Sequence, residues 1–194
     1  GTQWAWDGVT VERFLALVRE VHAAVDGRME LMLDGNCRLS EAEALDIALE
    51  LDRLGFAWFE EPIPNADIEA NARLNAAVDM PITGGESFTT LEQFRPYLDA
   101  GAYDIVQMDA GLCGITVAAR YGVDVCPHSW HNILMGLANG HAVAALPNGR
   151  VLEQCMIQGP LQMDILAEPP LIKDGRLLFD GRPGLGATLA ENLE

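Results

Sequence analysis

Six short apolar runs, each ending in an acidic residue or a histidine, recur along the chain at intervals of 19 to 26 residues. That interval is about the length of one strand and one crossover helix. The residues at the ends of the runs are, in chain order, Asp34, Glu60, Glu86, Asp109, His128 and Glu153. Because the carboxyl ends of the strands meet at one mouth of a parallel barrel, we expect these side chains to converge there. The pattern therefore predicts an α/β fold of the TIM-type (β/α) barrel class.

The run that ends in Glu60, Glu61 and Pro62 marks the most sharply defined of these strands. Pro62 has no N–H group for a ladder hydrogen bond, so the strand should stop before it. Neighbouring residues of a strand point to opposite sides, which leaves only one of the two glutamates facing the mouth. We expect Glu60 to face the mouth, and Glu61 to point outward or to pair with a neighbouring helix.

The length of the chain limits how much of a barrel it can hold. Its 194 residues are 49% hydrophobic, which is ample for a core. A barrel of eight strand–helix units usually takes about 250 residues, and six units are visible. We therefore expect roughly two units to lie before Gly1. The prediction is a partial barrel over residues 1–168, followed by a C-terminal hairpin and tail over 169–194.

Helices are expected between the strands, where apolar residues recur at helical spacing. The predicted helices lie near 11–25, 41–54, 67–78, 90–99 and 134–146. Ser40 and Glu43 form a capping box before the second of them. Pro96 should cut or kink the fourth. The segment 114–122 has room for barely two turns, less than an average helix.

Composition excludes several classes of partner and site. The formal charge of −17 argues against nucleic acid and anionic membranes as partners. The four cysteines form no Cys-x-x-Cys pair, which argues against a structural zinc site and a disulfide framework. No apolar run approaches the roughly 18 residues of a membrane span, so a cytoplasmic location is the default expectation. The only lysine is Lys173, so no strand of this chain can offer a lysine base at the mouth.

Three of the strand-end residues are carboxylates on successive strands: Asp34, Glu60 and Glu86. Carboxylates held close together repel one another unless a cation joins them. Hard oxygen ligands without thiolate or imidazole suit Mg²⁺ best, with Mn²⁺ as the next choice. We therefore predict a Mg²⁺ site. The competing interpretation is that these acids are solvated or pair with arginines.

The other strand-end residues suggest acid–base chemistry. An aspartate that accepts from one imidazole nitrogen raises the basicity of the other, so Asp109 and His128 are a candidate base pair. Glu153, if protonated, could donate a hydrogen bond to a developing oxyanion. Alternatively, His128 is a hydrogen-bonded wall residue and Glu153 a structural carboxylate. Residues that flank the strand ends are candidates for substrate binding or, equally, plain loop residues: Asn36, Arg38, Trp130, His131 and Asn132.

Seven short motifs, taken together and in order, resemble the barrel domain of the enolase superfamily, in the mandelate racemase/muconate lactonizing enzyme family and its mandelate racemase subgroup. They are LMLDGN, FEEP, PITGGE, DIVQMD, CPHSW, VLEQ and RPGLGATL. The resemblance implies barrel strands three to eight, a capping domain before Gly1 and a homo-oligomer. It also implies Mg²⁺ ligands at Asp34, Glu60 and Glu86, a catalytic dyad of Asp109 and His128, and an electrophilic acid at Glu153.

The same resemblance implies a reaction that begins by removing the proton α to the carboxylate of a small-molecule substrate. The run 104–109 lacks the lysine of the muconate-lactonizing branch, and His128 follows on the next strand, which favours the mandelate racemase type. We expect a hydro-lyase that dehydrates a sugar acid, an aldonate or an aldarate, to a 2-keto-3-deoxy acid. The alternatives are an isomerase that racemises or epimerises 2-hydroxy acids, and a non-catalytic fragment that retains a metal site.

Overall fold

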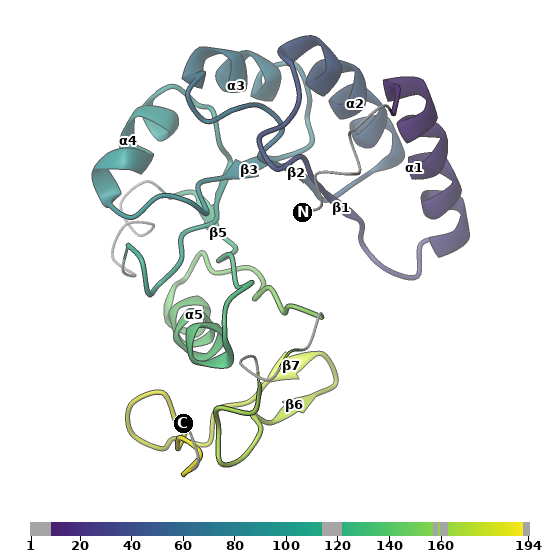
Figure 1. Cartoon of the computed structure of the whole chain (residues 1–194). Helices are drawn as coiled ribbons and strands as arrows, with labels where there is room; N and C mark the ends of the chain where they lie inside the picture. Colours follow the sequence, from purple (N-terminus) through teal and green to yellow (C-terminus); the bar gives the residue numbers. More distant parts are fainter. Residues whose placement is uncertain (1–8, 114–121, 157–158, 160–162, 192–194) are drawn as a thin grey trace. The chain divides into compact units, whose positions relative to one another are not determined.

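A computed structural model describes residues 9–113, 122–156, 159 and 163–191 (Figure 1). The chain forms two compact units. The first unit comprises residues 1–85 and 92–105, and the second comprises 86–91 and 106–194. The predicted short segment at 114–122 falls almost wholly on residues outside this description.

The first unit is built on short parallel strands that are hydrogen-bonded in chain order: β1 (Met32–Asp34), β2 (Trp58–Glu60) and β3 (Ile82–Gly84). The register pairs Asp34 with Glu60, and Glu60 with Thr83. Phe59 and Ile82 are fully buried, as expected for a sheet covered by helices. The chain enters the next strand through Asp104, whose N–H donates to the carbonyl of Ile82 at 2.9 Å.

The predicted helices of this unit are confirmed: α1 (Val11–Val25), α2 (Glu41–Leu54), α3 (Ile68–Asn75) and α4 (Leu91–Asp99). Helices α1 to α3 cover one side of the strands (Figure 1). The capping box of Ser40 and Glu43 is present, and Gly55 ends α2 in the left-handed conformation. Pro96 lies inside α4 and does not cut it.

The described residues of the second unit form one long helix and several very short strands. They are β4 (Ile105–Val106), which begins at the boundary of the units, β5 (Asp124–Val125), α5 (Ile133–Ala145), β6 (Ile172–Lys173) and β7 (Arg176–Leu177). The N–H of Cys126 donates to the carbonyl of Val106 at 3.1 Å and so joins β5 to β4.

The prediction of a strand at Val151–Glu153 is wrong. The other five predicted strands are present and are shorter than expected. The backbone pairs with β5 earlier in the sequence, through a parallel bridge between Gly149 and Val125. The N–H of Arg150 donates to the carbonyl of Val125, and the chain then leaves the ladder. Val151 is consequently 44% exposed, although its apolar side chain suggested a buried strand.

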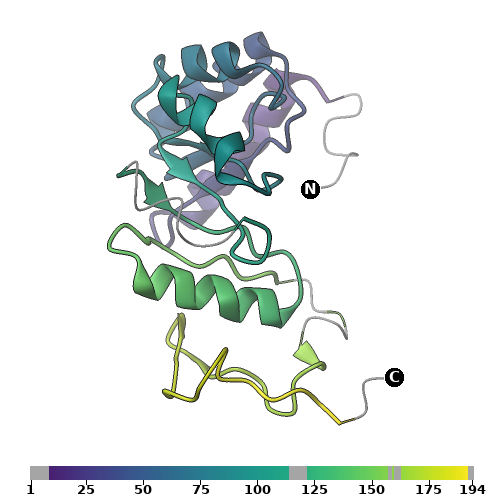
Figure 2. The ribbon, with the colours of Figure 1, turned by 90° about the vertical axis from the view of Figure 1, so that its left-hand side faces the viewer.

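β6 and β7 pair antiparallel as a hairpin, with Ile172 opposite Leu177 and Lys173 opposite Arg176. Asp174 and Gly175 both have positive φ, 51° and 71°, as a two-residue type I′ turn requires. Ile133 and Leu137 of α5 pack with Leu166, which precedes β6, and Leu185 of the tail packs against the same cluster. The segment after β7 lies beside α5 (Figure 2). In the part of the chain that is described, no helix is long and apolar enough to cross a membrane.

Candidate active site

Asp34 and Glu60 are the last residues of β1 and β2, and they are partners in the parallel register. Side chains at matched positions of neighbouring parallel strands leave the sheet on the same face, with their strands about 4.8 Å apart. The first unit therefore holds two of the three predicted metal ligands side by side, as the strand-end pattern predicted.

Asp34 is oriented by the residue two positions later. The N–H of Asn36 donates to Asp34 Oδ1 at 2.8 Å, and the Asn36 side-chain amide donates to Oδ2. Although Asp34 is exposed as a residue, surrounding protein atoms desolvate its carboxyl group and raise its pKa, and the carboxyl group of Glu61 adds to the rise. Asn36, predicted to bind substrate, thus has a local role in holding Asp34.

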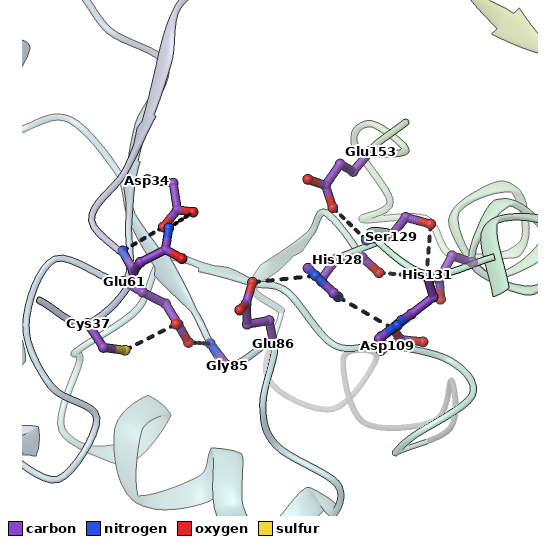
Figure 3. A network of polar contacts seen from close by, with 12 residues as sticks. Asp34, Cys37, Glu61, Gly85, Glu86, Asp109, His128, Ser129, His131 and Glu153 are labelled. Carbon is purple, nitrogen blue, oxygen red and sulfur yellow. Dashed lines mark hydrogen bonds and ion pairs between the residues drawn. The ribbon is translucent and has the colours of Figure 1, made fainter. Parts of the chain in front are cut away.

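Glu61 is buried, and the prediction that it points outward or pairs with a helix is wrong. Its exposed fraction is 4%. Its carboxylate accepts from Cys37 Sγ at 3.1 Å and from the N–H of Gly85 at 3.2 Å (Figure 3). It also accepts from Asn65 Nδ2 at 3.1 Å. The cause is local: Glu61 has a positive φ of 34°, which breaks the alternation of the strand directly after Glu60.

In the second unit, Asp109 faces two imidazole rings (Figure 3). Its Oδ2 lies 3.6 Å from His128 Nδ1 and 3.2 Å from His131 Nε2. Its other oxygen accepts from the N–H of Gly111 at 3.2 Å, which fixes the plane of the carboxylate. Asp109 is fully buried, whereas His131 remains partly exposed. The predicted pair of Asp109 and His128 is therefore brought together, and His131 joins it.

Glu86, the third predicted metal ligand, also approaches this group. It lies two residues after β3 and belongs to the second unit. Its Oε2 is 3.7 Å from His128 Nε2. His128 thus has a carboxylate near each of its ring nitrogens, Asp109 on one side and Glu86 on the other.

Asn139, which was not identified from the sequence, bonds to the backbone of the two loops that carry Asp109 and His128. It is fully buried in α5. Its side-chain oxygen accepts from the N–H of Ala110 at 2.7 Å, and its side-chain nitrogen donates to the carbonyl of His128 at 2.7 Å. One amide therefore links the residue after Asp109 to His128 itself. The available signal was an asparagine in an otherwise apolar helix, where a buried polar group needs partners.

Glu153 contacts the loop that carries His128. Its Oε2 accepts from the N–H of Ser129 at 2.5 Å, directly after His128. The residue therefore lies beside the dyad loop, as the sequence predicted, although its own segment is not a strand.

The predicted substrate-binding residues after β5 have different surroundings. Asn132 is the N-cap of α5, because its side-chain oxygen accepts from the N–H groups of Leu134 and Met135 at 3.0 and 3.3 Å. Trp130 is 45% exposed and is therefore accessible to a ligand. Arg38, which follows β1, is also exposed.

The family model described as Enolase C-terminal domain-like matches residues 2–193. The chain belongs to this family. A solved structure of a mandelate racemase/muconate lactonizing enzyme from Sulfitobacter sp. superposes with a TM-score of 0.85 at 27% identity, covering 93% of this chain and 47% of that one. The resemblance noted in the motifs is confirmed, and so is an α/β fold with parallel strands.

Among characterised relatives of this enolase-type chain are enzymes of sugar acids. L-talarate/galactarate dehydratase of Salmonella typhimurium is 32% identical over 92% of this chain and 44% of its own length. D-galactarolactone cycloisomerase of Agrobacterium fabrum is 30% identical over 92% of this chain and 52% of its own length. The chain thus spans about half the length of the curated relatives that it matches.

Proposed function

We propose that this chain carries the acid–base centre of a sugar-acid dehydratase, which converts an aldonate or an aldarate to a 2-keto-3-deoxy acid. The observation that carries the proposal is the buried carboxylate of Asp109 facing His128 Nδ1 at 3.6 Å. A relative that acts as L-talarate/galactarate dehydratase supports the choice of substrate class. We further propose that residues 1–168 form part of a barrel, with residues 169–194 as its C-terminal hairpin and tail.

His128 is the proposed base. Its imidazole takes the proton from the carbon α to the substrate carboxylate, and the electron pair of that C–H bond moves into the carboxylate. Asp109 stabilises the imidazolium that forms, and Asn139 holds the backbone of both loops. The electron pair then returns from the carboxylate to form the C2–C3 double bond, and the β-hydroxyl group takes the proton held by His128 and departs as water. The resulting enol becomes the 2-keto-3-deoxy acid, so the reaction is balanced without an oxidant or a reductant.

A hard divalent cation fits the donor set of Asp34 and Glu60. Their register places two carboxylates on neighbouring strand ends, and burial raises the pKa of Asp34, an unfavourable effect on the carboxylate that a bound cation would offset. We propose that these two residues, with Glu86, hold Mg²⁺, for which Mn²⁺ is the closest substitute. The ion would supply positive charge to offset the negative charge that develops on the substrate carboxylate.

The remaining polar residues are proposed to act on the substrate. Glu153 is the proposed acid for the developing oxyanion, since the hydrogen bond from Ser129 fixes it beside the dyad loop. Arg38 and Trp130 are exposed and are proposed to contact the substrate. Asn36 and Asn132 contribute indirectly, through Asp34 and the start of α5.

The test is a screen of the full-length protein with Mg²⁺ against aldonates and aldarates, with detection of 2-keto-3-deoxy product. Formation of product by the parent protein and not by His128→Asn is expected. Solvent deuterium entering recovered substrate without keto product would replace the proposal by a racemase or epimerase of 2-hydroxy acids. Neither product nor exchange, in a protein that binds Mg²⁺, would leave the non-catalytic alternative.

A second candidate is favoured by the relative that acts as D-galactarolactone cycloisomerase. The same proton removal by His128 would then be followed by departure of a ring oxygen instead of a hydroxyl group. Sugar lactones added to the screen distinguish the two, because ring opening gives an isomer and releases no water.

A further inference from the structure

We propose that Asp109, His128 and His131 form a second cation site, one that selects Zn²⁺ and similar transition-metal dications over Mg²⁺. One ligand atom from each residue lies within 4.8 Å of the other two. This site shares no ligand residue with the predicted Mg²⁺ site of three carboxylates. All three of its residues belong to the second unit.

The distances suit a small tetrahedral ion. Asp109 Oδ2 is 3.2 Å from His131 Nε2 and 3.6 Å from His128 Nδ1. Ligand atoms at the corners of a tetrahedron with metal–ligand bonds of 2.0–2.1 Å lie about 3.4 Å apart. The two pairs therefore already have nearly the required separation. The imidazole rings stand at 81° to each other with centroids 5.0 Å apart, so neither ring blocks the other from the shared oxygen.

Two of the ligand atoms are buried and unsatisfied. Among the residues that the structure describes, Asp109 Oδ2 and His128 Nδ1 are both shielded from solvent without a hydrogen-bond partner. Leaving such atoms unpaired is costly, and coordination to one cation would satisfy both. Asp109 is fully buried, and its carboxylate is directed at the two rings. A carboxylate is costly to bury, and here it points into the proposed site.

The surrounding contacts hold these atoms in place before any ion arrives. Gly111 donates to the second oxygen of Asp109, which leaves Oδ2 for the imidazoles. Asn139 bonds to the backbone of Ala110 and His128. A site whose ligands are already oriented loses less conformational freedom when it binds.

The donor types determine the class of ion. Two imidazole nitrogens and one carboxylate suit Zn²⁺, Ni²⁺ or Co²⁺, whereas Mg²⁺ takes oxygen ligands almost exclusively. A cation bound to Asp109 and His128 would occupy the two residues that the proposed function assigns to proton abstraction. The bound ion therefore inhibits proton abstraction, and the site makes the proposed enzyme sensitive to Zn²⁺ in the presence of ample Mg²⁺.

The test is calorimetric titration of the full-length protein with Zn²⁺ in a large excess of Mg²⁺. One Zn²⁺ per chain is expected, and His131→Gln should lower its affinity more than about 100-fold, beyond the usual effect of losing an outer partner. Mg²⁺ affinity should not change in His131→Gln. His141→Gln is the matched control, because His141 lies in α5 of the same unit and stacks on Phe179.

Cobalt provides a second readout, which uses the parent protein and so does not depend on whether His131→Gln folds. Co²⁺ bound to the parent protein should show the absorption of a nitrogen- and oxygen-ligated ion, and Cys113→Ser should leave it unchanged. Cys113 is the necessary control because its thiol donates to the backbone carbonyl of Asp109 at 3.4 Å. Unaltered Zn²⁺ affinity in a folded His131→Gln, displacement of Zn²⁺ by Mg²⁺, or a thiolate-to-cobalt band would each overturn the proposal.

Discussion

Asp34 and Glu60 are partners in the parallel register, each at the last position of its strand. The pairing leaves two acidic groups on one face with only a strand spacing between them. Such an arrangement is unfavourable for two ionised groups alone and favourable for two groups that share a cation.

Glu60→Gln should lower the affinity for Mg²⁺ by about 10- to 100-fold or more, because a neutral amide replaces a charged ligand. Calorimetric titration of the chelated protein measures this directly. Glu69→Gln is the matched control, since the Glu69 side chain is 93% exposed on α3. Equal affinities in parent and Glu60→Gln proteins would remove Glu60 from the ligand set.

His128→Asn should bind Mg²⁺ normally and lose about 10²- to 10⁴-fold in kcat, the usual contribution of a general base. Steady-state kinetics on the substrate found in the sugar-acid screen, paired with Mg²⁺ titration, separates the two effects. His22→Asn in α1 should retain full activity. Undiminished turnover by His128→Asn would assign the base to another residue.

Glu61→Ala should destabilise the fold by about 1–3 kcal/mol, because the buried N–H of Gly85 and the amide of Asn65 would lose their acceptor. Denaturant unfolding monitored by circular dichroism gives the difference. Glu69→Ala removes an exposed glutamate and should change the unfolding free energy by less than about 0.5 kcal/mol. Equal losses in both variants would show that the Glu61 contacts contribute nothing specific.

Glu50 should make the fold sensitive to acid. Hydrogen bonds from Arg53 and Arg19 lower the pKa of Glu50 from 4.5 to about 2. The folded state therefore holds this carboxylate ionised more strongly than the unfolded chain does. Its stabilisation is complete above about pH 4.5 and is lost as the pH falls toward about 2.

Unfolding free energies measured across that pH interval test the effect. Glu50→Gln should show a shallower loss of stability with acid than the parent. Asp46→Asn, an exposed position on the same helix, should follow the parent curve. Parallel curves for parent and Glu50→Gln would mean that the arginines do not stabilise the ionised form.

Helices and strand order were predictable because local chemistry determines them. Ser40 and Glu43 cap α2 with each other, and Gly55 ends that helix, so neighbouring residues alone set its bounds. Five of the six predicted strands were placed correctly but were expected to be longer than they are. Asp109 and His128 thus lie three residues beyond β4 and β5, in loops that still bring them together.

The errors arose where the backbone departs from the regular strand that the local pattern suggested. Strand alternation would turn Glu61 away from the mouth, but its left-handed backbone directs it to donors from three segments. The apolar run at Val151 resembled a strand, yet the available edge of β5 is already occupied by Gly149 and Arg150. His131 also contacts Asp109, but the sequence marked it only as a residue that flanks a strand end. Its approach to Asp109 depends on the turn before α5.

The amide of Asn139 has an evolutionary consequence. It must accept from Ala110 and donate to His128 at the same time, and Asn139 itself is fully buried. Aspartate would keep the acceptor and lose the donor, and leucine would keep the volume and lose both. Position 139 should therefore tolerate almost no substitution in a lineage that keeps the reaction, although this residue never meets the substrate.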